Sequence, residues 1–334
     1  MENNTGLVKG RQTVAPFYDI INVYVVFLRS RGHGVKGMRI QRLSGGLACQ
    51  VFQYVFMRYG QLANPEEDWY LDDSEFFVSD KYNGYELENV FGVKPKLLSQ
   101  AFDEDVWQEM MEKKKNGISI PQMMMESGVP MIMYAEDDSY KTQNPFTGRV
   151  YRMLPEGGFY PEVPSLDAAD IYYHGTWIEK NWFNSNREIN LKELAFPEIK
   201  SDQAKVYMNE IKEGVSVALH IRRGDYVELG LAQDTKYYFN AMKDLAQMYD
   251  NFTVYVFSDD LFWCNQHAYE LGLNFAPKIV YISGNMKEES YVDLQLMSMC
   301  RVIVMANSAF SFLAGIMDTR LERYMNPWTG EWGR

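Results

Sequence analysis

The sequence predicts an α/β protein of two domains, the second of which is built on a doubly wound parallel sheet. The chain has 334 residues, of which 46% are hydrophobic and 15% aromatic, enough to fill two cores. From residue 215 onward, apolar runs of strand length alternate with amphipathic helical segments. A polar stretch at residues 197–204 separates this regular half from a less regular half rich in Tyr, Trp and Met. We therefore expect two α/β domains with a cleft between them.

The first 37 residues share no pattern with the rest, whereas Met38 begins a strand-like run that turns at Ser44-Gly45-Gly46 into an apolar helix. We expect residues 1–37 to be an N-terminal extension ahead of a natural start at Met38. The two domains are then residues 38–196 and 197–334. Deleting the extension is expected to leave a folded protein, because truncation is tolerated where the removed backbone carries few contacts.

The second half repeats a strand followed by a helix. Val215–Ile221 is almost continuously apolar, as expected of a strand buried on both faces. The next helix, Tyr237–Tyr249, is predicted to bury a face made of Phe239, Met242, Leu245, Ala246 and Tyr249. Further strands are predicted at residues 252–257, 279–282 and 302–306, and helices at 261–271, 289–299 and after 306. This alternation implies a parallel, doubly wound sheet.

Composition excludes several classes of partner. A formal net charge of -12 and an isoelectric point near 4.9 argue against binding to nucleic acid or anionic lipid. The three cysteines, Cys49, Cys264 and Cys300, have no metal-ligand spacing and fit a reducing compartment. The apolar stretch Phe17–Leu28 is about half the length of a membrane span, and no cleavage site of a signal peptide follows it. We expect a cytoplasmic protein without a transmembrane segment.

Polar side chains follow three of the predicted strands at the edge where ligands of doubly wound sheets bind. After the first comes His220-Ile221-Arg222-Arg223-Gly224-Asp225-Tyr226. Two guanidinium groups beside a glycine are suited to a diphosphate, because Arg donates two parallel charge-assisted hydrogen bonds. The alternative is a surface ion pair between one of these arginines and Asp225.

The second strand end is Phe257-Ser258-Asp259-Asp260, and it predicts either a helix cap or a carboxylate that accepts hydrogen bonds from a guanine edge. A metal site ranks low there, because no loop aims both aspartates at one ion. At the third strand end, Asn307 or Ser308 is expected to cap the last helix, whose free N–H groups favour a phosphate. Together the three ends predict a diphosphate site.

Other chemistries lack support in the sequence. The histidines are scattered, at positions 33, 174, 220 and 267, and no nucleophile motif accompanies them. No Gly-rich dinucleotide or nucleoside triphosphate loop is present. A hydrolase, a dehydrogenase and a kinase are therefore disfavoured.

The motifs resemble, in order and spacing, those of the bacterial α-1,2-fucosyltransferases, glycosyltransferase family 11, over roughly residues 38–317. The matching segments are Gly45-Gly46-Leu47 with Gln50, Phe52-Gln53-Tyr54, Asn83-Gly84-Tyr85-Glu86-Leu87 with Phe91, Tyr172-Tyr173-His174-Gly175, His220–Tyr226, Phe257–Asp260 with Trp263-Cys264, and Leu296–Cys300 running into Ala306–Ser311. The resemblance implies a GT-B-like pair of domains with the donor site in the C-terminal sheet. It also implies GDP-fucose as donor, a galactoside hydroxyl as acceptor, inversion at the anomeric carbon, and neither metal nor cofactor.

Carried over residue by residue, the resemblance assigns Arg222 to the donor diphosphate and Asp225 to the same motif, where we expect it to be the base. Ser258 and Asp259 match the guanosine side. The phosphate-binding helix start is matched by Asn307, Ser308 and Phe310, and the rest of the predicted donor site is His220, Arg223, Gly45, Gly46 and Gln50. An enzyme of this kind would build surface glycans from the cytoplasmic side, either free or peripheral at the inner membrane.

This chain departs from the family pattern at three places, one of which is the tail after Asp318, where we expect the family's usual final strand and tryptophan segment to be lacking. Ala48-Cys49 replaces a Gly-Asn pair beside the donor, and Phe312-Leu313-Ala314 replaces Trp-Trp-Gly. Two alternatives therefore stay open: a transferase that uses another sugar nucleotide, and a catalytically silent GDP-sugar-binding protein. Aromatic residues are candidates for stacking on sugar rings, but core positions are the better interpretation for Trp69, Trp107, Tyr134, Trp177 and Trp182.

Overall fold

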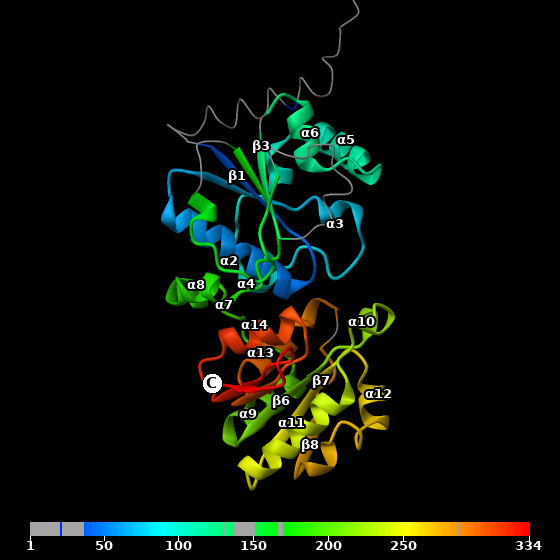
Figure 1. The fold of residues 1–334 in the computed structure, drawn as a ribbon. Coiled ribbons are helices and arrows are strands. Elements are labelled where there is room, and N and C mark those ends of the chain that lie inside the picture. The colour runs from blue at the N-terminus through cyan, green and yellow to red at the C-terminus, as the bar shows by residue number, and fades with distance from the viewer. Residues whose placement is uncertain (1–20, 22–36, 130, 137–150, 166–169, 286) are drawn as a thin grey trace, which may run out of the picture.

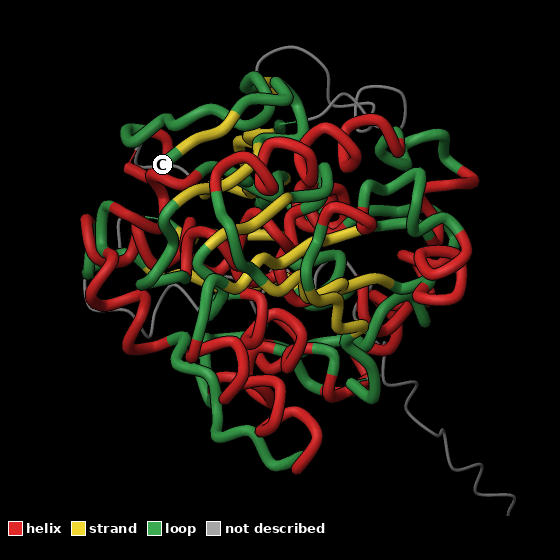
Figure 2. Tube along the Cα trace, turned by 90° about the horizontal axis from the view of Figure 1, so that it is seen from below, coloured by secondary structure: helices red, strands yellow, loops and turns green. Residues whose placement is uncertain are grey.

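The computed structural model describes residue 21 and residues 37–129, 131–136, 151–165, 170–285 and 287–334, and it contains two α/β domains (Figure 1). Each domain has its own sheet, and the view from below shows helices on both sides of the strands (Figure 2). Strands of the first sheet fall within residues 38–174 and those of the second within residues 216–333. The predicted α/β class with two sheets is confirmed. The exact domain boundaries stay a prediction.

All strands of the first sheet run parallel, in the order β2-β1-β5-β3-β4. The strands are β1 (Met38–Arg42), β2 (Asp68–Asp72), β3 (Met131–Ala135), β4 (Tyr151–Met153) and β5 (Asp170–His174). The helices are α2 (Leu47–Ala63), α3 (Glu75–Val78), α4 (Leu87–Phe91), α5 (Glu104–Lys115) and α6 (Ile120–Glu126), with α7 (Lys180–Asn184) and α8 (Arg187–Glu193) after β5.

The second sheet has the order β11-β10-β9-β6-β7-β8, and all its pairs are parallel except β10 with β11. Its strands are β6 (Ser216–Ile221), β7 (Thr253–Ser258), β8 (Lys278–Tyr281), β9 (Val302–Val304), β10 (Arg323–Met325) and β11 (Trp332–Gly333). The helices are α9 (Asp202–Glu213), α10 (Gly224–Glu228), α11 (Thr235–Met248), α12 (Leu261–Gln266), α13 (Tyr291–Met297) and α14 (Ala309–Met317). The predicted doubly wound sheet is confirmed.

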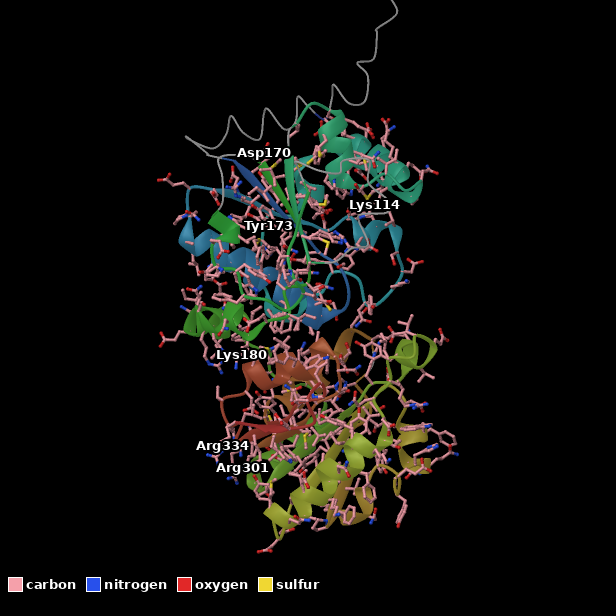
Figure 3. All side chains as sticks on the ribbon, in the orientation of Figure 1. Lys114, Asp170, Tyr173, Lys180, Arg301 and Arg334 are labelled. Atoms are coloured by element: carbon pink, nitrogen blue, oxygen red, sulfur yellow. The ribbon has the colours of Figure 1, made fainter. Side chains whose placement is uncertain are left out.

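Strand order reverses between β6 and β9, because the chain fills one side of β6 with β7 and β8 and then crosses to β9 and β10. A crevice opens at such a reversal, outside the carboxyl ends of the two strands. Figure 3 shows Asp170 far from the second domain and Tyr173 nearer to it, so β5 points its carboxyl end toward that domain. In Figure 1, α10, which follows β6 directly, lies on the side of the first domain. The carboxyl edges of the two sheets thus face each other.

Three predictions of detail are wrong. The buried face of α11 holds Tyr238, Ala241, Met242 and Leu245, whereas Ala246 is exposed and Phe239 is only half-buried. The spacing i, i+3, i+4, i+7 is still helical, but the face is turned toward Tyr238, whose ring is fully buried. The second error concerns the tail after Asp318, where β10 and β11 extend the sheet. The predicted helix at 261–271 also ends early, at Gln266.

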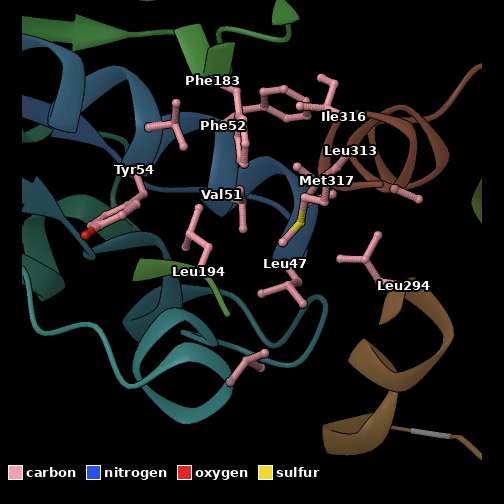
Figure 4. Close-up of a cluster of buried hydrophobic side chains, with 14 of the residues drawn as sticks. Leu47, Val51, Phe52, Tyr54, Phe183, Leu194, Leu294, Leu313, Ile316 and Met317 are labelled. Carbon is pink, nitrogen blue, oxygen red and sulfur yellow. The ribbon is translucent and has the colours of Figure 1, made fainter. Parts of the chain in front are cut away.

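One hydrophobic core joins the two domains (Figure 4). Leu47, Val51 and Phe52 on α2 meet Leu313 and Met317 on α14 within the same cluster. The Phe52 and Phe312 rings stack at 5.8 Å. The Arg187 guanidinium of α8 donates to the carbonyl oxygens of Ile316 and Asp318 at the end of α14, at 2.6 and 3.1 Å. The last helix is therefore held against the first domain despite the Phe312-Leu313-Ala314 departure.

All five aromatic residues weighed as sugar platforms are core residues: Trp69, Trp107, Tyr134, Trp177 and Trp182 are each at most 3% exposed. Within the described residues, no helix combines the length and apolar content needed to span a bilayer. The Phe17–Leu28 stretch, apart from Ile21, and His33 lie outside these residues. Ile21 is fully buried in the same core cluster as Met38 and Ile40.

Candidate functional site

Arg222 lies at the carboxyl end of β6, and its guanidinium is held between two carboxylates. Nη2 donates to Oδ1 of Asp225 at 2.6 Å, and Nη1 lies 2.8 Å from Oδ2 of Asp259. The ion pair with Asp225, weighed as an alternative from the sequence, is confirmed. Two of the five N–H donors of the guanidinium are engaged in these contacts, so three stay available to a ligand. The side chain is 30% exposed.

Asp259 connects the loops after β6 and β7. Its Oδ2 pairs with Arg222, and its Oδ1 accepts from the backbone N–H of Arg223 at 2.9 Å. A Cβ on Gly224 would lie 2.8 Å from Oδ2 of Asp259, so only glycine leaves room for this carboxylate. The glycine of the motif thus permits the approach of Asp259, a reason that the sequence did not reveal.

Arg223 points away from Arg222, toward α12. Its guanidinium carbon lies 3.5 Å from the centroid of the Trp263 ring. The His267 ring also stacks on Trp263, with the ring centroids 4.2 Å apart. Nε of Arg223 is 3.5 Å from Oδ2 of Asp260. A cation over the face of Trp is attracted by the ring quadrupole, which fixes the direction of the Arg223 side chain.

The polar residues after β7 largely hold their own loop. Oδ1 of Asp260 accepts from the backbone N–H of Trp263 at 3.0 Å and caps α12, and the Ser258 hydroxyl accepts from the N–H of Asp260 at 3.0 Å. The predicted helix cap is confirmed. Among the described residues, no group of three His, Cys, Asp or Glu side chains is arranged to hold a metal ion. The contact of Ser258 and Asp259 with a guanosine stays a prediction.

At the end of β9, Ser308 is the N-cap of α14 and accepts from the N–H of Phe310 at 3.3 Å. Asn307 donates from Nδ2 to the carbonyl oxygen of Leu231 at 2.8 Å. Tyr226 links this strand end to that of β6, because its hydroxyl lies 3.4 Å from the Asn307 carbonyl oxygen and its ring 5.5 Å from the Arg222 guanidinium carbon. The predicted loops after β6 and β9 are thus brought together at the reversal of strand order.

His220 lies beneath this site. It is 6% exposed, and its ring is 5.7 Å from that of Phe310. Burial, with the charge of Arg222 as a second cause, lowers the pKa of His220 to about 3, so the imidazole is neutral at pH 7. Its Nδ1 has no hydrogen-bond partner among the described residues. A neutral ring adds one donor or acceptor to the site and no charge.

The first domain contributes the N-terminus of α2. Gly45 has φ +78°, in the left-handed region, and Gly46 is the N-cap. Gln50 is fully buried: its amide donates to the carbonyl oxygens of Gly45 and Gly84 at 3.0 and 2.8 Å and accepts from the N–H of Glu86 at 2.9 Å. All of these bonds are internal, so Gln50 positions the loops around Gly45 and Gly84. Its direct contact with a donor stays a prediction.

Three residues near the site, Tyr82, Tyr226 and Trp263, received no role from the sequence, which singled out Cys49 as a departure from the family pattern. Burial raises the pKa of the Cys49 thiol to about 11, so it is protonated at pH 7 and behaves as a small apolar group. Burial and, second, the negative charge of Asp225 in the other domain raise the pKa of Tyr82. The signal for Tyr226 and Trp263 was their place in the same motifs. Tyr82 had none, because it is close to Arg222 only in the folded chain.

The site therefore offers an arginine, a helix N-terminus and a neutral histidine at one crevice. Two arginines and three aspartates meet there, Arg222 and Arg223 with Asp225, Asp259 and Asp260. An anion that binds Arg222 must compete with Asp225, the more exposed of its two carboxylate partners at 43%. Such an arrangement suits a ligand whose own negative charge is high.

Comparison with known proteins finds related glycosyltransferases. The chain is 32% identical over 151 residues to the alpha-1,2-colitosyltransferase of Escherichia coli, an alignment that covers 43% of this chain and 50% of that protein. It is 26% identical over 296 residues to the O-antigen biosynthesis glycosyltransferase WbnK of Escherichia coli, with 83% of this chain and 89% of that protein covered. Among solved structures, the fucosyltransferase NodZ from Bradyrhizobium matches with a TM-score of 0.48 at 10% identity, covering 89% of this chain and 97% of that one.

The family model of Glycosyl transferase family 11 matches residues 145–329. This range is more than half of the chain, and it includes all the strand ends that form the crevice at Arg222 and Ser308. The chain therefore belongs to glycosyltransferase family 11.

Proposed function

We propose that this glycosyltransferase moves L-fucose from GDP-fucose to the 2-hydroxyl of a galactoside, with inversion at the anomeric carbon and without a metal ion. The observation that carries the proposal is the position of Arg222 at the reversal of strand order, joined through Tyr226 to the start of α14. Diphosphates bind at such reversals, where guanidinium groups and helix N–H groups meet them.

The chemistry follows from charge. The acceptor oxygen bonds to the anomeric carbon while the bond from that carbon to the GDP oxygen breaks, and the departing diphosphate keeps the electron pair. Donors already aimed at the diphosphate stabilise this charge as it develops. Arg222, with the N–H groups at the start of α14, would supply the positive potential that a metal ion supplies in other transferases.

Asp225 is the proposed base. Its Oδ1 is bound by Arg222, and no described residue donates a hydrogen bond to its Oδ2, so this oxygen is available to accept the proton of the acceptor hydroxyl. When the diphosphate binds Arg222, it takes over the guanidinium that Asp225 held in its absence. Donor binding would thereby release the base, which places the donor before the acceptor in the order of binding.

The test is release of GDP. The full chain is incubated with GDP-fucose and a panel of galactosides, and both GDP and the fucosylated product are measured. We expect product only where a galactose carries a free 2-hydroxyl, and an unchanged rate in EDTA. Strong inhibition by EDTA would contradict the metal-free mechanism. Saturable GDP binding without any GDP release would favour the catalytically silent alternative, for which the Ala48-Cys49 departure is the motive.

A second candidate donor is a colitose nucleotide, because the relative with 32% identity is named a colitosyltransferase. Colitose is L-fucose without its 3-hydroxyl, so the two donors differ by one hydrogen-bonding group. A site built to pair that hydroxyl rejects the analogue that lacks it, whereas an apolar pocket hardly distinguishes them. Measuring kcat/KM for both donors with one galactoside decides between the two sugars. We propose a galactose-containing surface-glycan precursor as the acceptor, which agrees with the name of the O-antigen relative.

A further inference from the structure

Tyr82 is an exposed aromatic side chain of the first domain at the candidate site. It is 56% exposed, whereas the tryptophans considered from the sequence as sugar platforms are buried. A large aromatic ring left in contact with water beside charged residues is available to a ligand. The Tyr82 ring is therefore a candidate contact for a ligand at this site.

The loop that carries Tyr82 is tied to both domains. Gln50 binds the backbone of Gly84 and Glu86, as described above. Asn83 donates from Nδ2 to Oε1 of Glu86 at 3.1 Å, and the same group lies 2.9 Å from the carbonyl oxygen of Lys287 and 3.1 Å from the Ser290 hydroxyl of the second domain. These bonds fix the residue next to Tyr82 across the domain boundary.

Tyr82 itself has φ +62°, in the left-handed region that side chains other than glycine rarely adopt. Backbone strain of this kind persists where surrounding contacts over-determine the conformation, and it gathers at ligand sites. Here the bonds of Gln50 and Asn83 are those contacts. These bonds hold the strained residue at the boundary between the two domains, where more than half of its side chain is exposed.

The ring lies beside the start of α2. A Cβ on Gly46 would lie 3.5 Å from Cδ1 of Tyr82, which shows that the ring packs next to the N-cap of α2. Partial burial raises the pKa of Tyr82, and the negative charge of Asp225 is the second cause, which agrees with a position of the ring at the domain boundary near the proposed base. Tyr82 is thus on the first-domain side of Asp225, opposite the loops that would hold the diphosphate.

We propose that the Tyr82 ring is a stacking platform for the pyranose ring of the acceptor. The inference rests on the proposed function. In a single displacement with inversion, the acceptor approaches the anomeric carbon from the face opposite the diphosphate. In the proposed function the second domain binds the diphosphate, so the acceptor would enter from the first-domain side, where Tyr82 and Oδ2 of Asp225 would contact it. The phenol offers an apolar face to the C–H groups of the sugar and a hydroxyl to its rim.

The test measures acceptor binding separately from transfer. Lactose is titrated into the full chain saturated with GDP, in wild type, Tyr82→Phe and Tyr82→Ala. We expect Tyr82→Ala to weaken lactose affinity about tenfold, Tyr82→Phe to stay within about twofold, and the affinity for GDP to be unchanged in both. Tyr269→Ala is the matched control, because Tyr269 is 74% exposed and lies on the α12 side of the second domain.

Wild-type lactose affinity in Tyr82→Ala would overturn the inference, as would the absence of lactose binding by the GDP-saturated wild type. A tenfold loss that Tyr269→Ala reproduces would overturn it too. Failure of the proposed function is recognised independently, as the absence of GDP release from GDP-fucose in the transfer assay. Lactose binding that depends on Tyr82 in a protein unable to use GDP-fucose would keep the platform and point to another donor sugar.

Discussion

At the scale of single residues, the site is organised by competition for Arg222. Asp225 and Asp259 both bind its guanidinium, but Asp259 is also anchored by the N–H of Arg223 and is the less exposed of the two at 27%. Among the described residues, Arg222 is the one side chain that binds the carboxylate of Asp225. An entering diphosphate therefore displaces Asp225 more readily than Asp259, which remains to orient the arginine.

This competition predicts opposite effects of two substitutions on GDP affinity. Arg222→Ala removes the charge-assisted donors and is expected to weaken GDP binding about tenfold to a hundredfold and transfer by at least as much. Asp225→Asn removes the competing anion and is expected to strengthen GDP binding by up to about fivefold, since exposed ion pairs contribute about 0–1 kcal/mol. It should nevertheless abolish most transfer, because the base is lost. Calorimetric titration with GDP and turnover measure the two effects.

Thermal melting serves as the control for both variants, whose melting temperatures should stay near that of wild type because the ion pairs are partly exposed. Normal turnover in Arg222→Ala would contradict the assignment of the diphosphate site. Weaker GDP binding in Asp225→Asn would contradict the displacement of the base.

At the scale of secondary-structure elements, the packing of α2 against β2 restricts which residue can stand at position 60. Gly60 is buried in its last turns, and a Cβ there would lie 2.2 Å from Cζ2 of Trp69. The Trp69 ring is itself enclosed, stacked on Tyr173 at 5.3 Å and edge-on to Phe56 at 6.2 Å. No single rotation frees the space, so the close approach of α2 to β2 depends on glycine.

Gly60→Ala is therefore expected to destabilise the protein by about 1–3 kcal/mol, although alanine favours a helix over glycine by about 1 kcal/mol. Gly315→Ala in α14 is the matched control. Its Cβ would lie 2.6 Å from Cε of Met305, the end of a flexible side chain that can turn aside. We expect its free energy of unfolding to change little. Denaturant unfolding of both variants checks the contrast, and equal losses would show that the Trp69 wall does not decide the outcome.

At the scale of the whole molecule, the two domains share one apolar core through α2 and α14. Domains move freely only where their interface is small and polar. Here buried leucine, phenylalanine and methionine side chains from both domains interdigitate, with the Arg187 bonds closing the end of α14. We expect the two domains to unfold together, and ligand binding to adjust the loops at the crevice more than the angle between domains.

Stability should fall as the pH rises from about 5 to 8. Burial raises the pKa of Asp73 to about 6 and those of Glu136, Asp293 and Asp318 to about 7. The unfolded chain releases these protons near pH 4, whereas the folded chain keeps them until near pH 7. Because the folded state binds more protons in this window, its stability decreases as pH rises through it and levels off above the folded pKa values. Melting temperatures at fixed ionic strength test the sign.

Asp293→Asn is the control for this dependence. The neutral amide keeps an oxygen for the side chain of Asn285, which donates to Oδ1 of Asp293 at 2.7 Å, but it does not titrate. We expect a flatter pH profile in this variant, with higher stability than wild type at pH 8. A wild-type melting temperature that rises from pH 5 to 8 would contradict the prediction.

Much of the fold was predictable because its signals are local. The apolar run of β6 is buried along its whole length, and Ser308 caps α14 as its position before the helix predicts. Buried parallel strands and helix caps depend on neighbours in the sequence. The predicted face of α11 was wrong because the helical spacing allows more than one face, and packing against β6 and β7 selects the one that buries Tyr238. The pairing of β10 with β9 was missed for a similar reason, since a three-residue strand has too short a pattern to recognise.

The sequence by itself determined the α/β class, the alternation of strands and helices in the second half, the three polar strand ends and the family resemblance. Each of these depends on residues that are adjacent in the chain. The tertiary structure alone decided that Asp259 grips Arg222, that Gly224 makes room for it, and that Tyr82 reaches the same crevice from the other domain. These relations join residues far apart in the chain. The distances between these residues are fixed by the order of strands in the sheet and by the shared core. Neither can be recognised from a pattern of neighbouring residues.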